Sequence, residues 1–260
     1  MNRHKIALPA LFMTALALSA CHDADFDAGP TRTETREVRS FDSIDLKGAA
    51  RLEVAIGSPA SLTLEGGDKV LQRLETEVRD GTLYISNKRR DWISLGTSPR
   101  ITLRVTVPQL AALNLEGGND VLLTGFNGGA ANLRLEGATH LKGVGEVQDL
   151  TVFMAGAGHA DLKDLVADDA KITVAGVGSV LVHPKNSLDA TMNGVGAILY
   201  TGNPREVSTH MNGLGTIARG EEKDFDDADK KKPRWHLHPG TPEPQHEPEA
   251  PVDDEPAIIT

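Results

Sequence analysis

A short glycine-centred motif recurs through the second half of the chain and restricts the fold more than any other feature. Its centre is a glycine that is followed two positions later by a small residue, usually a second glycine. The central glycines are 20, 19, 20, 18 and 19 residues apart, and they are Gly117, Gly137, Gly156, Gly176, Gly194 and Gly213. A fixed period near 19 residues without helical patterning predicts a solenoid, in which each coil stacks on the preceding one.

Alignment of the repeats on the central glycine places residues of like chemistry in columns. The columns two before, four before and four after the glycine are mainly apolar, whereas the residues between them are polar or small. Such alternation with a period of two is typical of a strand with one buried face. Each coil is therefore predicted to be a strand, a glycine corner and a second strand, and the fold class is an all-β parallel β-helix or β-solenoid. The column two before the glycine is Leu115, Leu135, Met154, Val174, Met192 and Met211.

The position two after the central glycine is expected to set the shape of the corner. It is glycine in the last four repeats, but Asn119 and Thr139 occupy it in the first two. Glycine and asparagine tolerate the positive φ that a tight corner requires, so Thr139 departs from the pattern. A phosphate-binding loop is the alternative for a Gly-x-Gly pair, but such a loop occurs once and opens a helix. Recurrence between strands favours the structural role.

Residues 39–110 contain further alternating segments, which are separated by glycine, proline and aspartate turn signals. We expect them to form wider or irregular coils that continue the stack and cap its N-terminal end. The segments are residues 41–46, 52–56, 61–65, 82–85 and 101–107.

The N-terminus has the organisation of a bacterial signal peptide. Two basic residues precede an apolar run of about 15 residues, which is short for a ~30 Å hydrocarbon core. Leu18-Ser19-Ala20-Cys21 resembles the lipobox of bacterial lipoproteins, so Cys21 is predicted to be lipidated and to anchor the protein to a membrane. His22 stands where an aspartate would retain a lipoprotein in the inner membrane, and this favours the outer membrane, with the domain periplasmic or surface-facing.

Composition separates the chain into four parts. Residues 1–20 are predicted to be the signal peptide, 21–38 the lipidated cysteine with a tether, 39–220 the solenoid, and 221–260 an acidic, proline-rich disordered tail. The chain has 37 acidic against 27 basic residues, a net charge of −10. Nucleic-acid binding depends on clustered Lys and Arg, so this charge excludes nucleic acid as a partner.

The ordered series of motifs resembles a known family. It runs from Arg39-Ser40-Phe41-Asp42-Ser43-Ile44 through Gly57-Ser58-Pro59, Asp80-Gly81-x-Leu83-x-Ile85 and Val105-x-Val107-Pro108-x-Leu110 into the glycine repeats. Over residues 38–220 this series resembles the putative auto-transporter adhesin, head GIN domain family, formerly a domain of unknown function. The resemblance implies a β-helical protein of the bacterial envelope, secreted or lipid-anchored. It identifies no catalytic residues in this chain.

The candidate binding residues lie on one predicted outward column and in one loop. Asp120, His140 and His159 stand three positions after their glycines and are expected to line up on neighbouring coils. Two His and a carboxylate are metal-ligand types, but side chains on three coils span ~10 Å, so we predict an exposed polar stripe and no metal or cofactor. Trp92, in a predicted loop, is the best single candidate for ligand contact. The alternative is a structural role, in which Trp92 covers the end of the core.

These observations predict a non-enzymatic, lipid-anchored envelope solenoid that presents a binding or adhesion surface for protein or glycan. Known catalytic signatures such as His-Glu-x-x-His or a serine triad are missing from the sequence. Two alternatives stay open at this stage. One is a carbohydrate-active β-helix enzyme, and the other is an accessory protein in envelope stress signalling.

Overall fold

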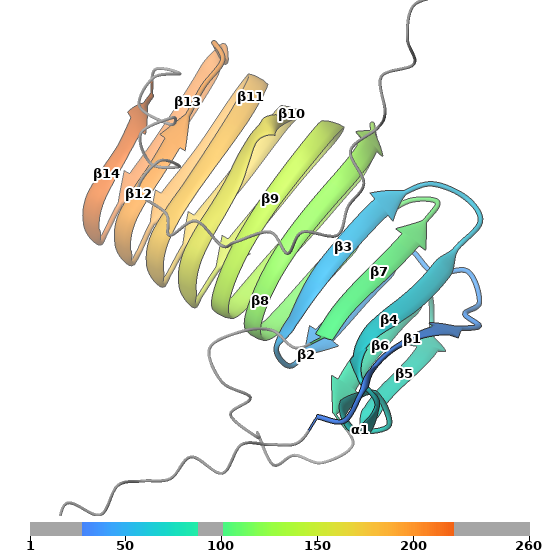
Figure 1. Ribbon diagram of the computed structural model, residues 1–260. Helices are drawn as coiled ribbons and strands as arrows, with labels where there is room; N and C mark the ends of the chain where they lie inside the picture. The colour runs from blue at the N-terminus through green and yellow to red at the C-terminus, as the bar shows by residue number, and fades with distance from the viewer. Residues whose placement is uncertain (1–27, 88–100, 221–260) are drawn as a thin grey trace, which may run out of the picture. The chain divides into compact units, whose positions relative to one another are not determined.

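The strands wind into a parallel β-solenoid of about five turns in the computed structural model, which describes residues 28–87 and 101–220 (Figure 1). The predicted fold class is therefore confirmed. In chain order the elements are β1 Thr31–Arg36, β2 Ser43–Lys47, β3 Ala50–Ile56, β4 Ser61–Gly67, α1 Asp68–Leu71, β5 Leu74–Arg79, β6 Thr82–Asn87, β7 Ile101–Val107, β8 Ala112–Asn127, β9 Ala130–Met154, β10 Ala157–Val174, β11 Val177–Met192, β12 Val195–Tyr200, β13 Glu206–Met211 and β14 Leu214–Arg219.

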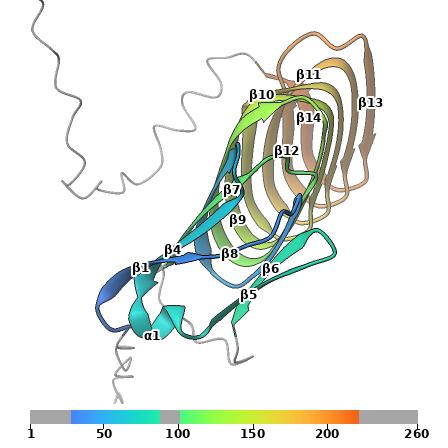
Figure 2. The ribbon, with the colours of Figure 1, turned by 90° about the vertical axis from the view of Figure 1, so that its right-hand side faces the viewer.

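Two sheet faces meet at the glycine corners. Face A contains the segments that precede each corner, and it extends from β5, β6 and β2 through parts of β8 to β11 and ends at β13. Face B contains the segments that follow each corner, and it extends from β1, β4, β7 and β3 through the other parts of β8 to β11 and ends at β12 and β14. Figure 2, turned by 90°, shows the successive coils one behind another.

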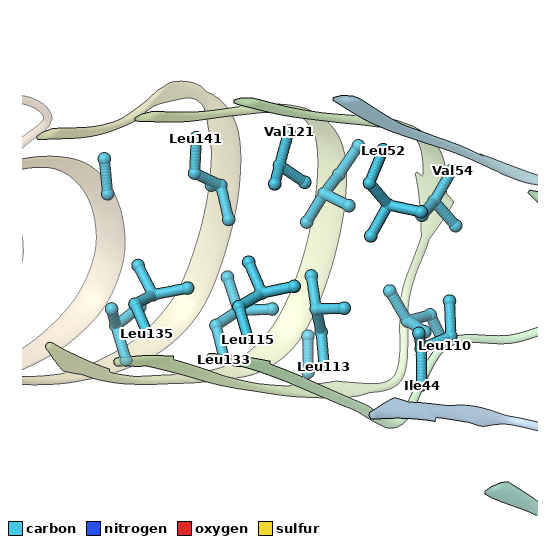
Figure 3. Packing of buried hydrophobic residues seen from close by; sticks show 14 of the residues in the cluster. Ile44, Leu52, Val54, Leu110, Leu113, Leu115, Val121, Leu133, Leu135 and Leu141 are labelled. Atoms are coloured by element: carbon cyan, nitrogen blue, oxygen red, sulfur yellow. The ribbon is translucent and has the colours of Figure 1, made fainter. Parts of the chain in front are cut away.

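The interior is filled by the predicted apolar columns. Leu115, Leu135 and Met154 from face A are 1–2 % exposed, and Val121 and Leu141 from face B are 0–2 % exposed. Figure 3 shows the leucines of face A pointing toward Val121 and Leu141 on the opposite side of the coil. Aliphatic residues of neighbouring coils thus stack along the axis and form one continuous core.

Close backbone contact between coils explains the glycine at each corner. A Cβ added to Gly176 would lie 1.8 Å from the carbonyl oxygen of Gly156, and one added to Gly194 would lie 1.9 Å from that of Gly176. Real Cβ atoms do not approach an oxygen this closely, so no other residue fits without moving the coils apart. The structural role predicted for the repeated glycines is the one that the packing requires.

The first two corners differ from the later ones, as expected from Asn119 and Thr139. In those two coils the central glycine itself adopts positive φ, at 115° for Gly117 and 107° for Gly137. In the later coils the second glycine does so instead, for example at 154° for Gly178. Neither Asn119 nor Thr139 has positive φ, so a residue with a side chain is tolerated at the second position because the turn has moved.

The side chains of these two residues point into the core and carry unpaired polar atoms. Asn119 is 4 % exposed and Thr139 is 3 % exposed, and the two are register partners on adjacent coils. The side-chain nitrogen and oxygen of Asn119 and Oγ1 of Thr139 have no hydrogen-bond partner among the described residues. Burial of such groups without partners is unfavourable, so this corner is a local weak point of the stack.

The N-terminal coils continue the stack, but their order along the axis differs from their order along the chain. The coil made by β2 and β3 lies between the coil made by β6 and β7 and the first repeat in β8. The pairs β2–β6 and β3–β7 are parallel, whereas β4 is added antiparallel to β7, and β1 and β5 form antiparallel edges. β1 lies inside the range predicted as a tether, so the sheet begins before residue 39.

Charged edge strands close this end of the sheets. β1 has the sequence TRTETR and β5 has LETEVR. Charged side chains on an edge strand oppose pairing with another sheet, so both strands act as a cap. β5 lies in the segment expected to cap this end, whereas β1 lies in the range predicted as a tether. Within residues 28–87 and 101–220 there is no helix with the length and hydropathy needed to cross a bilayer.

Replacement of a corner glycine tests the role of the close backbone contact. Gly176→Ala is expected to lower the free energy of unfolding by about 3 kcal/mol or more, because the new methyl group collides with backbone rather than with a movable side chain. Gly118→Ala is the control, since its Cβ would meet only Ala49 at 3.8 Å, and it is expected to stay within about 0.5 kcal/mol. Urea unfolding followed by circular dichroism measures both; equal effects would contradict the steric explanation.

Removal of the buried hydroxyl at the second corner is expected to stabilise the domain. Thr139→Val keeps the shape of the side chain and deletes an unpaired Oγ1, so the unfolding midpoint in urea is expected to rise by the equivalent of about 1 kcal/mol. Thr173→Val, at a half-exposed position, is the control and is expected to change little. A loss of stability in Thr139→Val would mean that a bound water satisfies the hydroxyl.

Candidate functional site

The predicted polar stripe is present on face B. Asp120, His140 and His159 are register partners on three successive coils, and Ser179 follows on the fourth. Nδ1 of His140 lies 3.4 Å from Oδ1 of Asp120, and Nδ1 of His159 lies 2.6 Å from Oγ of Ser179. The two imidazole rings stack at 5.8 Å with an interplanar angle of 21°. The alignment of these residues was therefore predicted correctly, and neighbouring side chains of the row contact one another.

The chemistry of the row is that of a surface hydrogen-bond ladder. His140 and Asp120 side chains are 44 % and 47 % exposed, so water surrounds both. The part of the chain that the structure describes holds no group of three or more His, Cys, Asp or Glu side chains placed to bind a metal. The Nδ1 atoms of the two rings face different partners, Asp120 for His140 and Ser179 for His159.

A charge network continues face B toward the N-terminal end. Arg104 on β7 lies between Glu53 on β3 and Glu65 on β4, at 3.1 Å and 2.7 Å. The hydrogen bond from Arg104 to Glu65 is the main cause that raises the pKa of Arg104 above its ordinary value. Both carboxylates are 31–40 % exposed, so these ion pairs fix the positions of side chains more than they stabilise the fold.

Face A carries a second outward row, which contains two aromatic residues. Cross-strand register places Tyr84 beside Asp45, then Asn114, then Arg134, and Arg134 in turn lies over the ring of Phe153 on the next coil. The guanidinium carbon of Arg79 lies 4.6 Å from the Tyr84 ring centroid, and that of Arg134 lies 4.6 Å from the Phe153 ring centroid. Four strand spacings of ~4.8 Å separate the ends, so the row is ~19 Å long. An arginine-aromatic pair therefore stands at each end of the row.

A shallow pocket of about 200 Å³ lies between these two pairs. Asp45, Asn114 and Arg134 of the row line it, together with the neighbouring row of Lys47, Glu116 and Glu136. Lys47 lies 3.5 Å from Glu116, and Arg134 forms an ion pair with Glu136. We call the pocket and its two flanking arginine-aromatic pairs the face-A site.

The face-A site can exchange many hydrogen bonds with a polar ligand. Its three carboxylates accept, its two cations donate, and the amide of Asn114 does both. Three negative and two positive charges give the pocket a net charge of −1, which disfavours an acidic ligand. A hydroxyl-rich neutral ligand, with apolar ring edges against Tyr84 and Phe153, matches this combination of groups.

The face-A site was not predicted from the sequence. Glu116 and Glu136 lie across the glycine corner from the histidine row, because the corner turns them onto face A. Tyr84 and Phe153 are 69 residues apart in the chain, and the non-sequential coil order places Asp45 between Tyr84 and the row of Asn114 and Arg134. Trp92 and Cys21, the other two predicted site residues, lie outside the described residues.

This chain matches the sequence model of a known protein family. A family described as putative auto-transporter adhesin, head GIN domain, matches residues 40–204. A comparison with curated proteins gave no match.

Several solved structures are similar to this chain. A putative adhesin from Bacteroides fragilis is 21 % identical, with a TM-score of 0.58 over 74 % of this chain and 97 % of that chain. A putative lipid binding protein from Parabacteroides distasonis is 22 % identical, with a TM-score of 0.43 over 74 % and 98 %. A putative adhesin from Parabacteroides merdae is 15 % identical, with a TM-score of 0.42 over 74 % and 97 %. At these identities the first likeness supports the fold alone.

Proposed function

The chain belongs to the putative auto-transporter adhesin, head GIN domain family, and we propose that it is a non-catalytic envelope protein whose face-A site binds a neutral glycan. The observation that carries this proposal is the pocket between Arg79 with Tyr84 and Arg134 with Phe153. Adhesin-like relatives make a role at the cell envelope or surface the natural setting.

The flat face of the solenoid favours an extended ligand. Parallel strands in register hold the side chains of one row at the fixed spacing between strands, so contacts repeat along the axis. Donors and acceptors on a shallow, open surface can bind the hydroxyl groups of several successive sugar rings. The pocket is also shallow and open, whereas many enzyme sites close around the reacting bond and control the access of water to it.

Variants of the face-A site test the proposal. Arg134→Ala and Phe153→Ala, in a chain of residues 22–260, are each expected to weaken binding to a neutral envelope polysaccharide about ten-fold, equivalent to ~1.4 kcal/mol. His159→Ala is the matched control on face B and is expected to leave the affinity unchanged. Isothermal titration against a panel of neutral and acidic glycans gives the Kd values.

Three other outcomes would each redirect the proposal. Binding that survives both face-A changes and falls with His159→Ala would move the site to face B. Slow release of reducing ends, abolished by Glu136→Gln, would favour the carbohydrate-active enzyme. Capture of a regulatory envelope protein with no affinity for any glycan would favour the accessory role in envelope stress signalling.

We further propose that Cys21 carries lipid and holds the domain at the outer membrane, periplasmic or surface-facing. Several acyl chains on one residue give stable attachment, at ~0.8 kcal/mol for each buried CH₂ group. In cells, Cys21→Ser is expected to move the protein from the membrane fraction to the soluble fraction and to abolish labelling by radioactive palmitate. Labelling that persists in Cys21→Ser would contradict lipidation at this residue.

A further inference from the structure

Exposed aliphatic side chains gather at the C-terminal end of the solenoid. Six large hydrophobic residues of the described ranges are exposed, and all but Val144 lie in the last three coils. Leu214 is 72 % exposed, Val207 is 44 % and Met211 is 43 %. Val177, Val195 and Leu214 are register partners, so they form an apolar ridge that leads along the corner to this end.

The last coil is built like an interior coil. Val207 and Met211 on β13 are register partners of Leu188 and Met192, which are 2 % and 0 % exposed. The coil also keeps the Gly-x-Gly corner, at Gly213 and Gly215. Terminal repeats of solenoids normally present a polar outer face, and this one presents core positions instead.

The backbone of this end is open as well. β13 pairs with β11 and β14 pairs with β12, and among residues 28–87 and 101–220 neither strand has a partner on its other side (Figure 1). A row of free N–H and C=O groups on two edge strands is a template for pairing with another chain. We call β13, β14 and their exposed side chains the open end.

The opposite end cannot supply the partner. There β1 and β5 carry Arg32, Glu34, Arg36, Glu75, Glu77 and Arg79, which oppose the addition of a further strand. Stacking of one molecule head-to-tail on another is therefore disfavoured, and an indefinite fibre with it. A closed two-fold dimer through the open ends alone is the arrangement that remains for two copies.

We propose that the open end binds the open end of a second copy, with β13 of each copy antiparallel to β14 of the other. The two-fold axis of this dimer runs parallel to the strands. It gives the two copies opposite stacking directions and brings face A of one copy into line with face B of its partner. Antiparallel order then places the first residue of β13, Glu206, beside the last residue of β14, Arg219. At the other ends of the strands it places Met211 beside Leu214.

Both contacts are complementary. Glu206 and Arg219 have opposite charges and are exposed, and Arg219 donates a hydrogen bond of 3.3 Å to Asn203 of its own chain. Met211 and Leu214 are the exposed apolar residues that such pairing would cover. The two-fold axis makes each contact occur twice, so the open end is complementary to itself.

Charge reversal across the interface tests the dimer. Sedimentation equilibrium of residues 22–260 is expected to give a concentration-dependent dimer. Glu206→Arg and Arg219→Glu are each expected to raise the dimer Kd about five-fold, since each places like charges together at two sites. The double variant Glu206→Arg with Arg219→Glu restores opposite charges and is expected to recover the wild-type Kd. Glu77→Arg, the same change on an edge strand of the other end, is the control and is expected to leave the Kd unchanged.

Other occupants of the open end would give different results. A monomer at all concentrations in both residues 22–260 and residues 22–220 would overturn the proposal. A monomer for 22–260 and a dimer for 22–220 would show that residues 221–260 cover the open end, and this too would overturn it. A dimer that is equally sensitive to Glu77→Arg would place the interface elsewhere. These measurements contain no glycan, so their failure is independent of the face-A site.

Discussion

Contact between the backbones of successive corners is the constraint on which the rest of the molecule depends. The carbonyl oxygen of one corner glycine occupies the space that a Cβ of the next would need, as between Gly156 and Gly176. This contact fixes the spacing of the coils at the distance between paired strands, so that register is maintained from coil to coil. Apolar residues then stack inside, and polar residues stack outside in straight rows.

The two faces use these rows differently. Face B places His140 and His159 in a ladder of neighbours that bind one another. Face A holds opposite charges around a shallow pocket and ends in aromatic rings on both sides. A rigid array of this kind suits recognition of a repeating polymer, because the ligand meets side chains whose positions the sheet has already fixed. The same rigidity gives little means to enclose a substrate.

Features set by one repeat could be predicted from the sequence, and features set by contact between distant segments could not. The buried columns and the row of Asp120, His140 and His159 follow from the period alone, and the structure confirms both. The altered first corners followed from Thr139, a residue that tolerates positive φ poorly. The face-A site depends on Tyr84 lying two strands from Asn114, which the period does not encode. Exposure of Met211 depends on the stack ending there, since its column is buried in every earlier coil.

The order of the N-terminal coils has a consequence for how the chain assembles. β2 and β3 leave the ribosome before β6, β7 and β8, yet each is flanked in the finished stack on both sides by one of these later strands. Neither sheet is complete around them until residues 101–127 have been synthesised. Every coil after β8 then needs only its immediate predecessor, so growth becomes sequential and proceeds in one direction. We therefore expect the N-terminal coils to form the folding nucleus and the glycine repeats to be the part that elongates.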